Sequence, residues 1–282
     1  MISQNIVMAG DGHFHLYPCY DPAVAINSLV DNLNLMADVS RGQEQEKNIF
    51  KIAFLAESRQ HDYFHKILEN EISFKPAGLV VSAGPETHCI SFNKQGKTEL
   101  CLVAGRQIVA REKIEILGLG MEEIVPDGLH AEEIIEKVIA AGALPVLAFS
   151  PGKWLFKRAD VVRGLAEKYG SKLIIGDSAL RPYGWPEPEI MRRARGKILP
   201  GSDPLPISGE EKYSGRYGFI YQGLFDVSKP FTAMKEIISN KPEAIITSGK
   251  RCSVLNVAGR LIGLRRNKAR IILPSAFCLL TL

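Results

Sequence analysis

The sequence predicts an α/β fold in which parallel strands alternate with helices, arranged as a barrel or a distorted barrel. Apolar segments of strand length alternate with amphipathic segments of helix length through much of the chain, and parallel strands need such helical crossovers. Polar motifs also follow several of these strands directly. Ligands bind at that edge in barrels and in open parallel sheets.

The first elements are a strand, a helix and a second strand. Residues 6–15 are typical of a strand, and residues 22–34 of a helix that is capped by Asp21 and begins at Pro22. The second strand is expected over residues 51–56. Strand-like segments at 87–92 and 99–103 then flank a turn at Gly96, so we expect a small antiparallel insertion over about residues 87–111.

The second half of the chain is more regular. Glycine follows each of its three predicted helices, which is a common way for a helix to end. We expect strands at 114–120, 144–149, 172–176 and 197–199, and helices at 131–141, 159–169 and 187–195. The predicted organisation is one barrel domain over residues 1–250 and a basic and apolar tail over residues 251–282.

Composition places the chain among ordinary globular proteins. Apolar residues make up 46% of the 282 residues and charged residues 23%, so a folded core is expected. The net charge of +4 is mild for this length, and we expect no nucleic-acid partner. The five cysteines include no Cys-x-x-Cys pair, which favours reduced, buried thiols over a disulfide framework or a cysteine-rich zinc site.

The two ends of the chain favour a cytoplasmic location. The first residues lack the basic and apolar regions of a signal peptide, and the apolar stretch 271–282 is shorter than the roughly 20 residues of a spanning helix. The basic segment 260–270 before this stretch would allow the tail to contact an anionic membrane surface. A surface helix with a docked or frayed end is the interpretation that we favour.

The strongest motif is the run Asp11-Gly12-His13-Phe14-His15 at the end of the first strand. Side chains two residues apart on a strand point to the same face, so the two imidazoles and the Asp11 carboxylate should lie together. Neutral imidazole is a common ligand for transition metals. We therefore predict that His13 and His15 bind a metal; a hydrogen-bonded structural pair is the other interpretation.

A second polar segment, Gly118-Leu119-Gly120-Met121-Glu122, follows the strand at 114–119. Its two glycines do not form a dinucleotide-binding loop, because the third glycine is missing and the helix begins too late. Glu122 is a candidate metal ligand and a candidate catalytic base. It is equally consistent with a carboxylate at the beginning of a helix.

Three loops after later strands carry further candidates. Asp177 and Asp203 are carboxylates that could complete a metal shell, and Asp203 before Pro204 is equally typical of a turn. The cationic candidates for binding an anionic substrate group are Lys153, Arg181 and Arg216.

The order of these motifs resembles the PHP family, named for polymerase and histidinol phosphatase domains. The run ending in His15 resembles the family's His-x-His motif, Gly120-Met121-Glu122 its Gly-x-Glu strand end, and Gly201-Ser202-Asp203 its closing motif. The resemblance covers about residues 6–206 and implies a distorted (β/α)7 barrel of the TIM type. It departs from the family at two places where the family has histidine: the run Ala148-Phe149-Ser150-Pro151 after a middle strand, and Leu205 two residues after Asp203.

The resemblance implies a metal-dependent hydrolase, a phosphoesterase that acts on a small phosphorylated molecule. The expected metal ligands are His13, His15, Glu122 and Asp203, around one ion of zinc, manganese or iron. Glu122 or Asp177 would act in catalysis. The missing histidines leave a second hypothesis open, in which a degenerate, non-catalytic barrel binds a small ligand or a protein partner.

Overall fold

The computed structural model describes residues 3–41, 48–194 and 197–272, and it is built on two mixed sheets. The seven-stranded sheet contains, in spatial order, β12 (Ile246–Gly249), β11 (Tyr217–Asp226), β1 (Ser3–Phe14), β2 (Asn48–Leu55), β5 (Lys97–Val103), β4 (Cys89–Lys94) and β3 (Val80–Ala83). The five-stranded sheet contains β10 (Ile198–Gly201), β9 (Ile174–Ser178), β8 (Leu144–Ala148), β7 (Glu115–Leu119) and β6 (Gly105–Val109).

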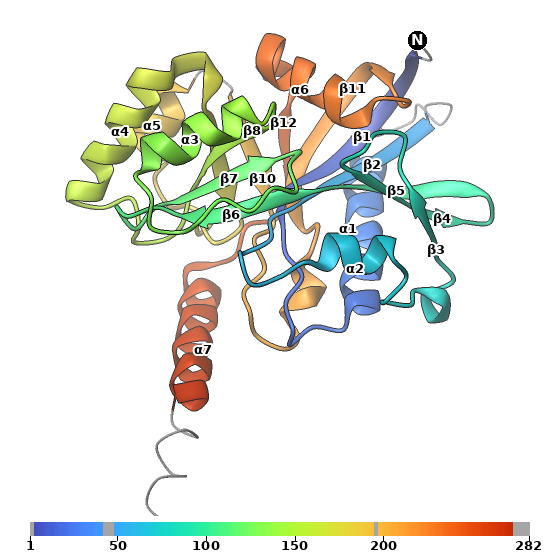
Figure 1. Ribbon diagram of the computed structural model, residues 1–282, viewed down its shortest axis with the longest axis horizontal. Coiled ribbons are helices and arrows are strands. Elements are labelled where there is room, and N and C mark those ends of the chain that lie inside the picture. The colour runs from blue at the N-terminus through green and yellow to red at the C-terminus, as the bar shows by residue number, and fades with distance from the viewer. Residues whose placement is uncertain (1–2, 42–47, 195–196, 273–282) are drawn as a thin grey trace, which may run out of the picture.

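Helices cover the outer faces of both sheets (Figure 1). The first group packs on the seven-stranded sheet and consists of α1 (Pro22–Arg41) and α2 (Tyr63–Leu68). The second group packs on the five-stranded sheet and consists of α3 (Ala131–Ala140), α4 (Lys157–Tyr169) and α5 (Glu189–Arg193). The remaining helices are α6 (Pro230–Asn240) and α7 (Val254–Ile272).

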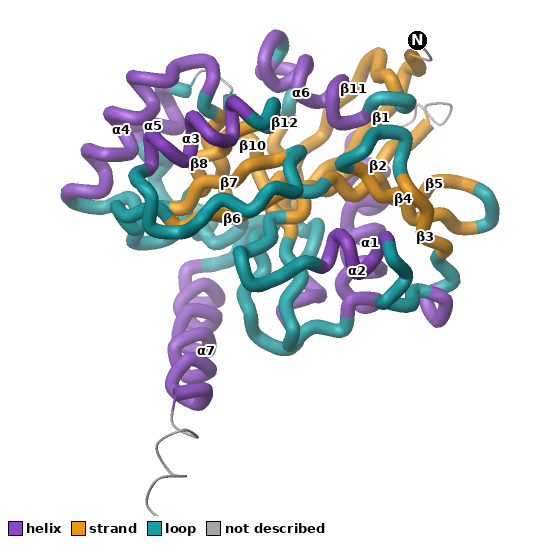
Figure 2. Tube along the Cα trace, viewed as in Figure 1, coloured by secondary structure: helices purple, strands orange, loops and turns teal. Residues whose placement is uncertain are grey.

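Three apolar clusters fill the spaces between the two sheets and between the sheets and their helices, whose arrangement Figure 2 shows. Alternate side chains of one strand enter different clusters. In β1, Val7 and Ala9 pack toward α1, whereas Ile6 and Met8 pack into the space between the two sheets. Strands that are buried on both faces have continuous apolar runs, as this strand has over residues 6–9.

The α/β class is confirmed, but the prediction of a distorted (β/α)7 barrel is wrong. Among the described residues, hydrogen bonds pair β10 with β9 alone and β1 with β2 and β11, so the strands form no closed ring. A single isolated bridge between Glu57 and Arg106 connects the two sheets. On the other side β10 packs against β1 through side chains and loop backbone rather than through a ladder of hydrogen bonds.

One strand runs in an unexpected direction. We expected parallel strands on either side of the helix at 131–141, but β7 pairs antiparallel with both β6 and β8. Residues that follow β7 therefore leave the sheet at the opposite end from residues that follow β8 and β9. This reversal decides where the predicted site residues lie.

Helix α7 follows β12 and extends away from the two sheets (Figure 1). Its attachment is the buried guanidinium of Arg260, which donates to Glu210 in the short 3-10 helix Glu210–Tyr213 and lies over the Tyr213 ring. None of the helices in the described part of the chain has the length and apolar character needed to cross a bilayer. The proposed division into a domain over 1–250 and a tail over 251–282 stays a prediction, and residues 273–282 lie outside the described residues.

Candidate metal centre

The end of β1 carries both predicted histidines into the space between the sheets. The pairing of β1 with β2 shifts register between Asp11 and Phe14, which breaks the regular alternation of side chains. Phe14 consequently packs in the same cluster as Val7, on the α1 side. His13 and His15 face the other side, where Gln107 of β6 and Asp203 lie beside them.

Asp203 comes to the histidines from the loop after β10. Its backbone N–H donates to the carbonyl of His13 over 2.9 Å. Its φ of +46° lies in the left-handed region, which aspartate tolerates better than most residues and which costs free energy. Ser178 also donates to the Oδ2 atom of Asp203, at 2.9 Å. The loop conformation and this hydrogen bond together fix the carboxylate over the end of β1.

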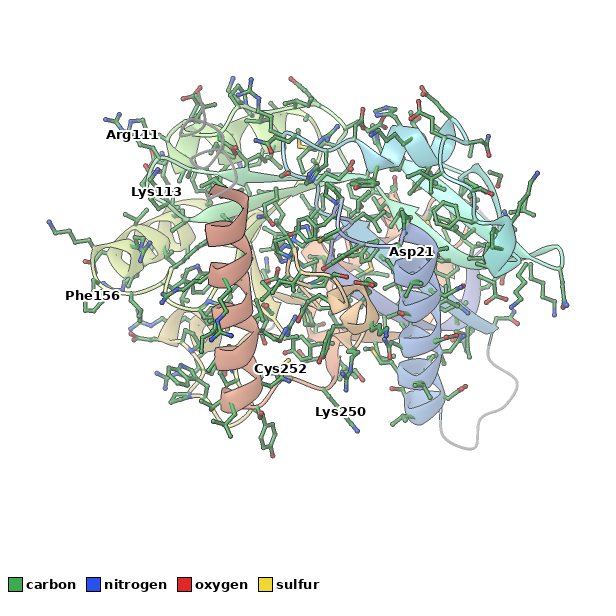
Figure 3. The ribbon with its side chains drawn as sticks, turned by 90° about the horizontal axis from the view of Figure 1, so that it is seen from below. Asp21, Arg111, Lys113, Phe156, Lys250 and Cys252 are labelled. Atoms are coloured by element: carbon green, nitrogen blue, oxygen red, sulfur yellow. The ribbon has the colours of Figure 1, made fainter. Side chains whose placement is uncertain are left out.

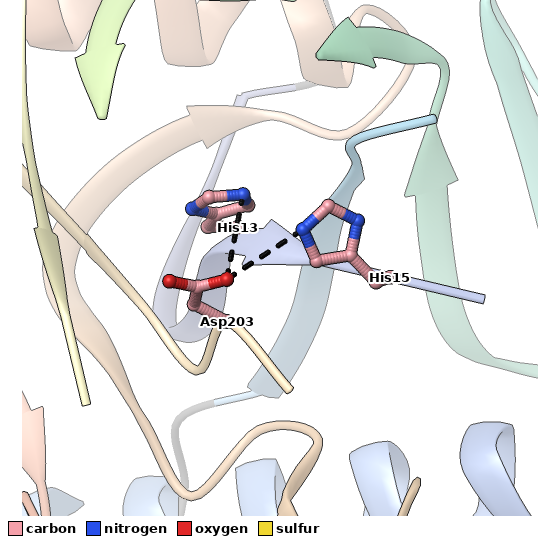
Figure 4. A group of neighbouring side chains, drawn as sticks. All are labelled: His13, His15 and Asp203. Atoms are coloured by element: carbon pink, nitrogen blue, oxygen red, sulfur yellow. Dashed lines mark ion pairs between the residues drawn. The ribbon is translucent and has the colours of Figure 1, made fainter. Parts of the chain in front are cut away.

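The three side chains have the spacing of metal ligands (Figure 4). The Nε2 atoms of His13 and His15 lie 3.9 and 3.6 Å from Oδ1 of Asp203, and one ligand atom from each residue falls within 4.8 Å of the others. These separations exceed an ordinary N–H···O hydrogen bond. Two ligands at about 2.1 Å from one ion with tetrahedral angles are about 3.4 Å apart, so the observed separations suit a shared ion.

The electrostatics of the cluster also suit a cation. Burial lowers the pKa of His15, against the opposing effect of Asp203, and this direction favours the neutral ring, which has a lone pair for a metal. Burial disfavours the charged form of Asp203, but the imidazoles of His13 and His15 and the hydroxyl of Ser178 outweigh it and hold the pKa of Asp203 well below its usual range. The centre thus contains one carboxylate charge in buried surroundings.

Asp11 has a different place from the one we expected. Its carboxylate accepts hydrogen bonds from the backbone N–H groups of His13, Ser202 and Gly215, and from the Ser202 hydroxyl at 2.5 Å. It therefore joins β1 to the loops after β10 and before β11. Burial raises the pKa of Asp11, and these hydrogen bonds oppose that effect. Asp11 positions the histidines and is outside the group of ligand atoms.

Two residues that the sequence did not single out lie beside the centre. Oε1 of Gln107 is 3.1 Å from Nε2 of His13, and its Nε2 is 3.4 Å from Oε1 of Glu115. Glu115 in turn forms an ion pair with Lys153. Lys153, predicted to bind substrate, is thus linked to the centre through Glu115 and Gln107. Glu115 begins β7, and the antiparallel direction of β7 places it opposite Ala148, at the end of β8. The sequence carried no signal for this direction.

Glu122, predicted as a ligand and a base, lies in another cluster. Its carboxylate accepts from His65 Nε2 at 2.9 Å and from His88 Nδ1 at 2.6 Å. The other ring nitrogen of His65 is 2.7 Å from Asp62, and that hydrogen bond is the largest of the effects that raise the pKa of His65. Glu122 is not among the described residues whose ligand atoms gather with His13. Its predicted roles stay untested.

Asp177, the second predicted catalytic carboxylate, is surrounded by cations. Arg181 donates to both of its oxygens, Arg251 donates at 2.7 Å, and the Tyr217 hydroxyl lies at 2.5 Å. Burial works against the charged form, but these partners lower the pKa of Asp177. Arg181, predicted to bind substrate, is therefore engaged within the protein. Arg216, the third predicted cation, is exposed and lies over the Tyr213 ring.

No family model and no curated sequence matches the chain. Solved structures similar to it include PsfC from Pseudomonas syringae PB-5123, with 12% identity, a TM-score of 0.47, and coverage of 94% of this chain and 99% of that one. The lesion-specific endonuclease PfuEndoQ from Pyrococcus furiosus has 14% identity, a TM-score of 0.45, and coverage of 84% and 56%. Endonuclease Q in complex with a 27-mer duplex substrate has 14% identity, a TM-score of 0.44, and coverage of 84% and 57%.

The chain thus spans just over half the length of the two endonuclease Q structures. Similarities at this level do not identify the family of this chain. The expectation of no nucleic-acid partner is corrected as well: a mild net charge does not by itself exclude such a partner, and one of the structures named above contains a 27-mer duplex substrate with an abasic lesion.

Proposed function

We propose that this protein is a metal-dependent hydrolase of phosphate esters, with its centre at His13, His15 and Asp203. The observation that carries the proposal is the spacing of three ligand atoms, too long for hydrogen bonds and suited to one shared ion. The motif order that resembles the PHP family supports the phosphate-ester class. A small phosphorylated molecule and a nucleic-acid phosphodiester are both within this class.

The residues around the centre suit the roles that hydrolysis requires. When bound there, a divalent cation lowers the pKa of a coordinated water and polarises the bond under attack. Zinc, manganese and iron all accept a set of two imidazoles and a carboxylate. Gln107 offers an amide oxygen beside His13 as a further ligand or as a hydrogen-bond partner of the substrate.

Glu115 and Lys153 are the proposed catalytic pair, connected to the centre through Gln107. Glu115 is the carboxylate whose contacts lead through Gln107 to His13, so we assign it the role of proton acceptor. Lys153, held by Glu115, would bind the negative charge that develops on the phosphate. The carboxylate oxygens of Asp177 already accept hydrogen bonds from Arg181, Arg251 and Tyr217. We assign Asp177 the role of holding these two arginines in place.

A non-catalytic function is the second candidate, and one observation favours it. Only three ligands gather among the described residues, while Glu122 is engaged with His65 and His88. A centre with few ligands can bind a metal or a small anion without turning over a substrate.

Hydrolysis assays on protein loaded separately with zinc, manganese and iron test the proposal. The probes are 4-nitrophenyl phosphate, bis(4-nitrophenyl) phosphate and a DNA duplex that carries an abasic site. We expect turnover of at least one probe, a loss of about 100-fold or more in His15→Ala, and a loss of about 100- to 10,000-fold in Glu115→Gln. Glu122→Gln is the matched comparison and should retain most activity. Full metal loading without turnover of any probe would establish the non-catalytic function instead.

A further inference from the structure

A large apolar cavity lies on the outer face of the five-stranded sheet, between α4, α5 and α7. Its volume is about 920 Å³, near the upper end of the range of about 300–1,000 Å³ for small-molecule sites. The main apolar side chains of its walls are Phe149, Trp154, Val162, Leu173, Ile175 and Leu261. None of these residues belongs to the metal centre.

One of the helices that border the cavity is short. Helix α5 has five residues, whereas α4 has thirteen, and Ile175 of β9 is among the residues that line the cavity beside α5. Val257 and Leu261 of α7 close another side. Figure 3 shows α7 beside the layer that contains α4 and α5.

The mouth of the cavity exposes apolar side chains to solvent. Leu155 and Trp185 line it and are 52% and 54% exposed, and the adjacent Phe156 is 87% exposed. Phe156 has a φ of +56°, which is strained for a phenylalanine, and it extends outward at the edge of the molecule (Figure 3). Contiguous exposed apolar surface around a cavity is typical of a site that binds a ligand.

The charges of the walls are balanced within the protein. Arg193 pairs with Glu189 at 2.5 Å, and Arg163 pairs with Asp160 at 3.1 Å. The lining as a whole contains as many carboxylates as cations: Glu167, Glu187 and Glu189 against Arg163, Arg193 and Lys197. A lining without net charge complements an uncharged ligand better than an anion or a cation.

One polar group in the wall lacks a partner. The indole N–H of Trp154 is buried and makes no hydrogen bond with the described residues. A buried N–H without an acceptor costs free energy, and an acceptor brought by a ligand would remove that cost. The ligand class that meets both conditions is an uncharged apolar chain that carries an oxygen.

We propose that this cavity binds a single long alkyl chain that bears an ester or hydroxyl oxygen, with the chain along Ile175 and Val162 and the oxygen accepting from Trp154. This site is separate from the metal centre and does not depend on the proposed hydrolase activity. A fatty acyl ester is the chemical class of ligand that it fits.

The two tryptophans of the chain, Trp154 and Trp185, both line the cavity and provide a direct probe. Titration with methyl dodecanoate should change their fluorescence and saturate at one molecule per chain. Ala258→Phe places a ring from α7 into the cavity and should weaken binding at least tenfold. Asn256→Phe, two residues away and outside the lining, should bind as the wild type does.

The hydrogen bond is tested by comparing methyl dodecanoate with dodecane. The wild type should bind the ester several-fold more tightly than the alkane, and Trp154→Phe should remove that preference while still binding both, which Trp185 fluorescence would report. The proposal is overturned if the fluorescence does not saturate with the ester, or if Ala258→Phe binds as tightly as Asn256→Phe. It is also overturned if light scattering shows a dimer that Ala258→Phe dissociates, since a second copy would then cover this surface.

Discussion

At the scale of single residues, the buried Asp11 and Asp177 and the partly buried Asp203 differ in what surrounds them. Asp11 accepts from backbone and hydroxyl groups and joins loops to β1. Asp177 lies between two guanidinium groups. Asp203 faces two imidazoles at distances beyond hydrogen bonding and is the one available to a cation. The sequence presents all three as acidic residues on or near the end of a strand, so their partners distinguish their roles.

Removal of the Asp177 charge should be strongly destabilising. Asp177→Asn leaves the guanidinium of Arg181 buried without its counter-charge, and we expect the free energy of unfolding at pH 7 to fall by about 3–5 kcal/mol. Asp160→Asn breaks an exposed pair with Arg163 and should cost no more than about 1 kcal/mol. Urea denaturation of the two variants measures both values; equal costs would show that the buried network contributes little.

The Asp177 carboxylate also predicts how the stability of the fold depends on pH. Because the folded state lowers the pKa of Asp177, the carboxylate stabilises the fold at pH values above its ordinary pKa of about 4. That stability is lost as the pH falls through the lowered pKa of the folded state. The wild type should therefore lose stability in acid more steeply than Asp177→Asn does.

At the scale of elements, the site depends on the close approach of β10 to β1. A Cβ atom on Gly201 would lie 2.3 Å from the backbone nitrogen of His13, so only glycine allows this contact. Gly201→Ala should cost about 1–3 kcal/mol and displace His13 from the ligand group. Gly164→Ala on α4 meets no neighbour and should stabilise the helix by about 0.5–1 kcal/mol. Thermal unfolding and metal content of both variants test this contrast.

The elements also show what could be predicted from the sequence. The strand ending in His15 and the helices at α3 and α4 follow from apolar periodicity and from the glycines after them. The direction of β7 does not, because periodicity carries no information about which neighbours a strand pairs with. Glu115 therefore escaped notice, and Glu122 was expected beside His13, whereas it lies with His65 and His88.

At the scale of the whole molecule, two sheets replace the expected barrel, yet β1 and the loop after β10 still meet. The sequence motifs predicted the two segments that meet, residues 13–15 and residue 203. A closed barrel would also require hydrogen bonds between β1 and β10, and apolar periodicity cannot predict such pairing. The structure makes the contact through Asp11 and Ser202 instead. A metal centre at His13, His15 and Asp203 requires only that the end of β1 meets the loop after β10. The hypothesis of a metal centre therefore does not depend on a closed barrel.

The metal content of the purified protein, determined by elemental mass spectrometry after incubation with zinc, manganese or iron, tests the central claim most directly. The wild type and His130→Ala, which removes an exposed histidine paired with Glu112, should each contain about one ion per chain. His13→Ala/His15→Ala should contain none. Absence of metal from the wild type under every condition, or equal content in all three proteins, would contradict a metal centre at His13, His15 and Asp203.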